Sequence, residues 1–184
     1  MAILTILEAP HPVLNKKARP VDPGEFGPDV ARLLADMAET MYAAPGVGLA
    51  APQVGDSRRI IVADPGFEGE DGERLKGRDL VFMVNPEIVE RSKESMLYEE
   101  SCLSVPEFYQ DIKRSKRIKV RYQDAQGAPH EREYEEFGAI VIQHELDHLE
   151  GITLLERSSM FKRSRYVAKR KKRVTKGDRD EAQA

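Results

Sequence analysis

The chain has 184 residues, of which 40% are hydrophobic and 33% charged, a balance typical of one folded domain with a heavily charged surface. This composition excludes disorder as the overall state, and no run of about 18 apolar residues predicts a membrane-spanning helix. The single cysteine, Cys102, excludes an internal disulfide. Because the N-terminal segment lacks signal-peptide features and the chain has no heptad repeat, we expect a cytoplasmic monomer.

The first predicted element is an amphipathic helix over residues 29–43, where apolar residues recur at helical spacing. A glycine-rich loop follows at 46–55, and a polar loop or loose hairpin is predicted at 66–77. Apolar or alternating patterns predict strands in four segments: 59–63, 80–85, 116–122 and 131–134.

Two more helices are predicted, one from Phe137 to the stop at Gly151 and one over about 159–173. The strands fall into antiparallel-looking groups and the helices lie at separate places along the chain. This order indicates an α+β fold with antiparallel strands packed around a central helix, the one that ends before Gly151, and with a C-terminal helix.

The segment HELDH at residues 144–148 carries the strongest functional signal. Residues four apart lie on one helical face, so His144 and His148 can both reach a single metal ion. Glu145 lies one step around the helix, where its carboxylate can contact a metal-bound water without being a ligand. The alternative is a pair of solvated histidines, but half of the chain's four histidines fall in this motif. The central helix is therefore predicted to bind a metal.

A catalytic metal usually takes three protein ligands and a water, so one more ligand is needed. Cys102 is the preferred candidate, because it lies in a turn-like segment; most free cysteines are instead buried small apolar residues. His11 and His130 are weaker candidates, since both lie in segments typical of the surface. One thiolate and two imidazoles suit zinc and iron alike.

Three segments resemble, in the same order, the signature motifs of the peptide deformylase family: GVGLAAPQ at 46–53, ESCLS at 100–104 and QHELDHLEG at 143–151. The resemblance implies an enzyme that removes the formyl group from the N-terminal formyl-methionine of newly made polypeptides and releases formate. It also implies iron(II) held by Cys102, His144 and His148, with zinc, nickel or cobalt as replacements. Ser101 stands where the family usually has glycine, which bears on substrate docking.

The implied reaction assigns further roles. The metal makes hydroxide accessible near neutral pH for attack on the formyl carbon. Glu145 is expected to act as general base and then to deliver a proton to the departing amine. The resemblance implies that the side-chain amide of Gln53 and the backbone N–H of Leu103 stabilise the oxyanion.

The predicted substrate-binding residues lie in or next to these motifs: Gly46, Val47, Gly48, Ser101, Phe137, Ile140 and Val141. The apolar members are candidates for the methionine pocket, with ordinary core packing as the alternative. The glycines let the loop that carries Gln53 pair with an extended substrate, unless they are plain turn glycines. Glu100 and Arg114 are expected to form a supporting ion pair.

Three competing interpretations stay open. A zinc endopeptidase would need a later third ligand, for which Glu150 and Glu156 are candidates. A cysteine hydrolase would use Cys102 as nucleophile and His144 as base, which leaves the second histidine unexplained. An RNA-binding module would account for the basic C-terminal segment and for none of the three motifs.

Charge divides the chain into two parts. Ten Lys or Arg residues and no Asp or Glu lie between Arg157 and Lys176, so all 32 acidic residues lie elsewhere. We expect residues 1–158 to form the catalytic metallohydrolase domain and 159–184 a basic helix and tail of the same domain. The resemblance implies that this helix contacts the ribosome, with a solvated tail as the alternative; the predicted contact residues are Lys162, Arg165, Lys169, Lys172 and Arg173.

Overall fold

The computed structural model describes residues 2–44, 46–66 and 76–181, with side chains of the last helix described up to Lys172. The strands are β1 (Gly48–Ala50), β2 (Ile60–Ala63), β3 (Val81–Arg91), β4 (Ser95–Glu100), β5 (Gln110–Ser115), β6 (Arg117–Gln123) and β7 (Pro129–Glu135). The α-helices are α1 (Pro28–Ala43), α2 (Glu136–Leu149) and α3 (Met160–Glu181). Short 3-10 helices cover Pro12–Asn15, Pro23–Glu25 and Ala51–Val54.

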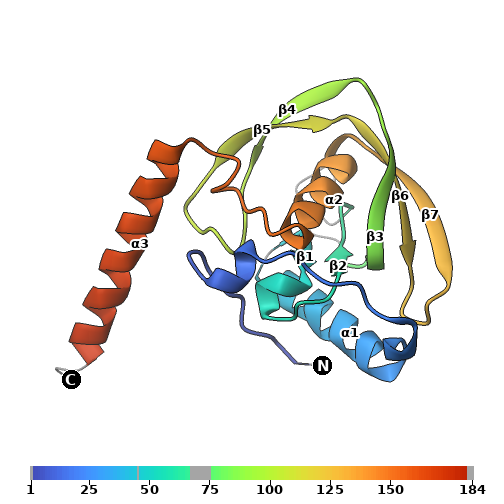
Figure 1. The fold of residues 1–184 in the computed structure, drawn as a ribbon, viewed down its shortest axis with the longest axis horizontal. Coiled ribbons are helices and arrows are strands. Elements are labelled where there is room, and N and C mark those ends of the chain that lie inside the picture. The colour runs from blue at the N-terminus through green and yellow to red at the C-terminus, as the bar shows by residue number, and fades with distance from the viewer. Residues whose placement is uncertain (1, 45, 67–75, 182–184) are drawn as a thin grey trace.

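The strands form two antiparallel sheets. Five of them pair in the order β1-β2-β3-β6-β7, and β4 pairs with β5 alone. The larger sheet curves around α2, which also contacts β5 of the smaller sheet (Figure 1). The predicted α+β class is confirmed.

Strand β2 explains how the sheet separates two apolar clusters. Its side chains alternate between the two faces of the sheet. Ile61 and Ala63 join the cluster under α2, whereas Ile60 and Val62 join the cluster under α1. All four are fully buried, which fits the continuous apolar run of a strand covered on both faces. The sheet under α2, the helix that carries His144 and His148, is therefore packed against an apolar cluster on each of its two faces.

The predicted strands and helices are confirmed, and most of their ends shift by one or two residues. β3 continues six residues beyond its predicted end, to Arg91, and α3 continues eight residues beyond its predicted end, to Glu181. Three strands were not predicted. β1 lies inside the segment predicted as a glycine-rich loop. β4 and β5 form a hairpin where no strand was expected. Most of the loop predicted at 66–77 falls outside the described residues. Among the described helices, none is both long enough and apolar enough to cross a membrane.

Two contacts fix the position of α2. The buried amide of Gln143 accepts from the Ser115 N–H at 3.1 Å and donates to the Ser115 carbonyl at 2.9 Å, which ties the helix to the end of β5. At the other end, Gly151 has φ +72° and lies against the backbone of Asn15. A Cβ at that glycine would stand 2.8 Å from the Asn15 carbonyl carbon, so only glycine fits.

We predict that Gly151→Ala lowers the free energy of unfolding by about 2 kcal/mol, because it combines backbone strain with a steric clash. A thermal melt should show Tm falling by roughly 5 °C. Gly24→Ala is the matched control, since a Cβ there meets nothing within 4 Å. Equal melting temperatures for Gly151→Ala and the control would contradict this account.

Candidate metal centre and active site

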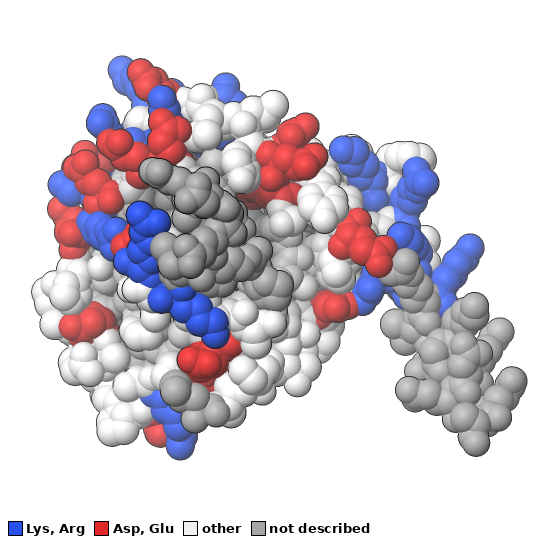
Figure 2. Space-filling view, turned by 180° about the vertical axis from the view of Figure 1, so that it is seen from behind, with Lys and Arg blue, Asp and Glu red and all other residues white. Residues whose placement is uncertain are grey.

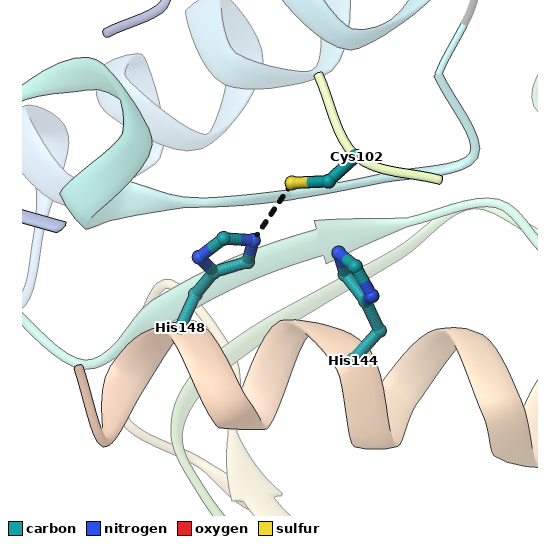
Figure 3. A group of neighbouring side chains, drawn as sticks. All are labelled: Cys102, His144 and His148. Carbon is teal, nitrogen blue, oxygen red and sulfur yellow. Dashed lines mark hydrogen bonds between the residues drawn. The ribbon is translucent and has the colours of Figure 1, made fainter. Parts of the chain in front are cut away.

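The structure brings the three predicted ligands together. Cys102 lies in the segment between β4 and β5, whereas His144 and His148 project from one face of α2 toward it (Figure 3). The ligand atoms of all three lie within 4.8 Å of one another, and Cys102 Sγ is 3.2 Å from His148 Nε2. Ligand atoms around one tetrahedral ion lie roughly 3.5 Å apart, so this donor set fits a metal ion.

Each imidazole is held in a different way. His144 Nδ1 lies 2.7 Å from Glu100 Oε2, which directs its Nε2 toward the other donors. Burial disfavours the charged form of His144, but hydrogen bonds to Cys102 and Glu100 outweigh it and raise its pKa well above the ordinary value. Burial, with a smaller contribution from the positive charges of His144 and Arg114, lowers the pKa of His148 well below its ordinary value.

A buried ion network stands behind His144. Arg114 pairs with both oxygens of Glu100, at 2.7 and 2.9 Å, which confirms the predicted ion pair. Burial alone would raise the pKa of Glu100, but hydrogen bonds from Arg114 and His144 lower it to about 2. Arg114 also contacts Asp147 at 2.6 Å, and Arg157 binds the same carboxylate. The network therefore links the hairpin β4–β5, α2 and the segment before α3.

Glu145 is buried beside the ligands, and its Oε2 has no partner among the described residues. Burial raises the pKa of this carboxyl to about 7. Gly48 makes room for it, because a Cβ at that position would stand 2.8 Å from Glu145 Cδ. The first-motif glycine thus has a packing role that the sequence analysis did not predict.

Gln53 is almost fully buried with its amide aimed at the metal ligands. Its Oε1 accepts from the Ala50 N–H at 2.8 Å, so its Nε2 faces the other way. That nitrogen donates to Ser104 Oγ at 3.1 Å and lies 3.7 Å from Cys102 Sγ. In the described part of the chain, no acceptor takes the backbone N–H of Leu103. Both predicted oxyanion donors therefore lie at the site.

A cavity of about 470 Å³ opens beside the ligands. All the predicted substrate-binding residues line it: Gly46, Val47, Gly48, Ser101, Phe137, Ile140 and Val141. Ile140 and Val141 are also core residues, so the pocket and core interpretations both hold for them. Ser101 is exposed at the cavity and its φ is not positive, so the backbone there does not require the glycine usual in the resembled family.

The alternative ligands lie elsewhere. His11 accepts from the Val13 N–H in an exposed turn, and His130 pairs with Asp124 on the surface. The two carboxylates considered for a peptidase are also engaged away from the site. Glu150 pairs with Lys17 and Arg59, and Glu156 with Thr153 and Arg163.

The five cations predicted to contact the ribosome lie on α3, but they do not form one free stripe. Two contact the body instead: Lys162 Nζ donates to Gln110 Oε1, and Lys169 pairs with Glu107, both at 3.0 Å. The basic segment contains no acidic residue of its own, as the sequence indicates, but acidic and amide side chains of the body pair with part of it. Of the remaining three, Arg165 and Lys172 are exposed, and the side chain of Arg173 lies outside the described side chains.

Comparison with known proteins identifies this arrangement. The profile of the polypeptide deformylase family matches residues 3–164. The chain belongs to the peptide deformylase family. Peptide deformylases of Phenylobacterium zucineum and Desulfotalea psychrophila are 44% and 46% identical to it, each over 94% of this chain and 97% of the relative.

Solved peptide deformylases share the fold. The crystal structure of the Thermotoga maritima enzyme has a TM-score of 0.77 and 43% identity, covering 86% of this chain and 99% of the other. The Ehrlichia chaffeensis enzyme has a TM-score of 0.85 and 36% identity, covering 96% and 99%. The sequence-based identification of the family is confirmed.

The sequence analysis assigned no role at the site to three residues that contribute to it. Ser104 fixes the Gln53 amide, and Asp147 and Arg157 extend the ion network. Asp147 offered a signal, because an acidic residue near the C-terminus of a helix is disfavoured unless a cation is near. The other two gave none, since their partners are distant in sequence.

We predict that Arg114→Leu lowers the free energy of unfolding by about 3–5 kcal/mol, because it leaves Glu100 buried without its cation. Zinc affinity should fall by about 10- to 100-fold, since His144 loses its fixed orientation. Denaturant unfolding and metal titration measure the two effects. Arg121→Leu removes an exposed pair with Glu131 and should change stability by less than about 1 kcal/mol. Similar losses in the two variants would contradict a special role for the buried pair.

Proposed function

We propose that this deformylase removes the formyl group from the N-terminal formyl-methionine of newly made polypeptides in the cytoplasm and releases formate. One observation chiefly supports the proposal: the donor atoms of Cys102, His144 and His148 lie within 4.8 Å of one another, beside a cavity that is lined by the buried Glu145 and by several apolar side chains. The apolar part of this cavity suits an unbranched apolar side chain such as methionine, bound beside a hydrolytic centre.

We propose that Cys102, His144 and His148 hold iron(II), with zinc, nickel or cobalt as replacements. When bound, the metal lowers the pKa of a coordinated water toward neutrality and polarises the substrate carbonyl. The donors suit zinc and iron alike, and the resemblance to the family favours iron. Metal analysis of protein purified without oxygen tests this: zinc alone would contradict it.

Glu145 handles the protons in this proposal. Its unpartnered Oε2 takes the proton of the attacking water and later delivers one to the departing amine nitrogen. Glu145 is buried and packs closely against the backbone of Gly48, and this packing restricts the position of its carboxylate. A base that is already in position needs no rearrangement in the transition state.

Gln53 and Leu103 stabilise the negative charge that develops on the formyl oxygen. Gln53 Nε2 is held in place by its hydrogen bond to Ser104 Oγ. In the described residues no protein group accepts a hydrogen bond from the Leu103 N–H, so this donor is available to the substrate oxygen. Donors fixed before the reaction are each worth about 3–4 kcal/mol of the barrier.

The substrate backbone is expected to run as an extended strand between the two sheets. Among the described residues, β1 is an edge of the larger sheet, and one edge of β4 in the two-stranded sheet has no pairing strand. Residues of both strands line the cavity, so a peptide there can pair with main-chain groups on each side. Val47, Phe137, Ile140 and Val141 then receive the methionine side chain, and Ser101 lies beside its backbone.

Formate release from a formyl-Met peptide, with and without a chelator, tests the proposal. The wild-type enzyme should release formate and lose activity with chelator, and Cys102→Ala should lose both metal and activity. A cysteine hydrolase would ignore the chelator, a peptidase would cleave the chain without formate, and an RNA-binding module would do neither.

We predict that Glu145→Gln keeps about one metal per chain but loses about 10²- to 10⁴-fold in kcat, because the ligands remain and the base does not. Formate release and metal analysis measure the two quantities. Glu150→Gln, on the exposed end of the same helix segment, is the control and should retain its rate. Full metal content with a wild-type rate in Glu145→Gln would end the proposed mechanism.

We further propose that residues 159–184 act as a basic helix and tail that contacts ribosomal RNA, appended to the catalytic part, 1–158. Basic side chains gather on the described part of α3, and acidic side chains flank it on the body (Figure 2). The main candidates for contact with ribosomal RNA are Arg165, Lys172 and Arg173. Lys162 and Lys169 also contact Gln110 and Glu107 of the body, so we expect them to contribute less to RNA binding.

We predict that Arg165→Ala with Lys172→Ala lowers the salt slope of ribosome co-sedimentation by about 2, because each lost phosphate contact removes about one unit. Formate release from a short peptide should stay unchanged. Lys93→Ala with Arg117→Ala removes the same charge from other exposed positions and should have no effect. An unchanged salt slope in the α3 variant would show that these residues are not the contact.

A further inference from the structure

We propose that Tyr166 of α3 is a positioning residue that holds one wall of the active-site cavity and thereby sets the affinity for peptide substrate. The wall is the segment 105–109. This inference rests on the proposed deformylase function for its kinetic consequence, but the position of the wall can be measured independently.

The wall has little regular structure of its own. Val105, Pro106, Glu107, Phe108 and Tyr109 all line the cavity, and none lies in a described helix or strand. Glu107 has φ +60°, a left-handed conformation that costs energy for a residue with a side chain. A segment of this kind keeps its conformation only when its neighbours hold it.

Helix α3 supplies that support through Tyr166, whose apolar cluster also packs against Phe108 and Cys102. The Tyr166 hydroxyl donates to the Pro106 carbonyl at 3.2 Å, and its ring meets Phe108 edge-to-face with centroids 5.5 Å apart. Tyr166 is only 7% exposed and shares a small apolar cluster with Val105. Lys169 adds an ion pair with Glu107.

The buried contacts of Tyr166 matter more than the ion pair. The Lys169–Glu107 pair is exposed to solvent and therefore contributes little to stability, whereas the buried aromatic ring of Tyr166 contributes more. Val105 of the wall donates its N–H to the Cys102 carbonyl at 3.0 Å, so metal content has to be measured in every variant. The side-chain contacts of His144 and His148 run to Glu100 and Cys102 rather than to residues 105–109. Loosening the wall should therefore weaken substrate binding and leave the chemical step intact.

The test measures KM and kcat for a formyl-Met tripeptide in Tyr166→Phe and Tyr166→Ala, together with metal content. Tyr166→Phe loses one neutral hydrogen bond and should raise KM by up to about fivefold. Tyr166→Ala also loses the ring and should raise KM by about tenfold or more, with kcat within about twofold of wild type. Tyr134→Phe, a buried tyrosine that does not line the cavity, is the matched control and should keep its KM.

Hydrogen exchange over residues 103–110 reports the wall without any activity assay, and it should be faster in both Tyr166 variants than in Tyr134→Phe. An unchanged KM in Tyr166→Ala, or a fall in kcat at constant KM, would overturn the proposal. If Tyr166→Ala does not fold, Tyr166→Phe decides alone. If the wild-type enzyme releases no formate, the proposed function fails, and unchanged exchange at the wall would separately overturn this inference.

Discussion

The arrangement of the site depends on one buried ion pair, Arg114 with Glu100. Two charges deep in a protein are costly unless each is fully paired, and here the guanidinium is shared between Glu100 and Asp147. Glu100 in turn orients His144. Because Arg114 and Glu100 lie on paired strands and Asp147 on α2, the requirement for pairing draws the hairpin onto the helix. Cys102, two residues after β4, is brought to the histidines by the same constraint.

The second constraint is space. Gly48 on the edge strand and Glu145 on α2 occupy adjoining volume, so the strand can approach the helix only because one partner lacks a side chain. Gln53, three residues after β1, is then fixed by a main-chain N–H and by Ser104. The sheet edge, the Glu145 carboxylate and the Gln53 amide therefore form a single packed unit rather than three separate features.

Local periodicity was enough to predict the helices, the apolar strands and the HELDH face, because each signal lies within a few residues of sequence. The hairpin β4–β5 escaped prediction for a physical reason: its inward positions include Glu100 and Arg114, which a sequence pattern assigns to solvent. β1 escaped prediction because a strand of three residues that begins with a glycine is too short to show an alternating hydrophobic pattern. Similarly, the pairing of Lys169 with Glu107 joins distant segments, so no local pattern could indicate it.

The cluster beside Cys102 has a consequence for the order in which the protein is completed. It combines Ala9 and Leu14 from the beginning of the chain with Tyr166 from near its end. Because the chain is synthesised from its N-terminus, both sheets and α2 can form before Tyr166 has been added. The thiol of Cys102, a proposed metal ligand, therefore lacks part of its apolar surroundings until synthesis is almost complete and α3 packs against this cluster.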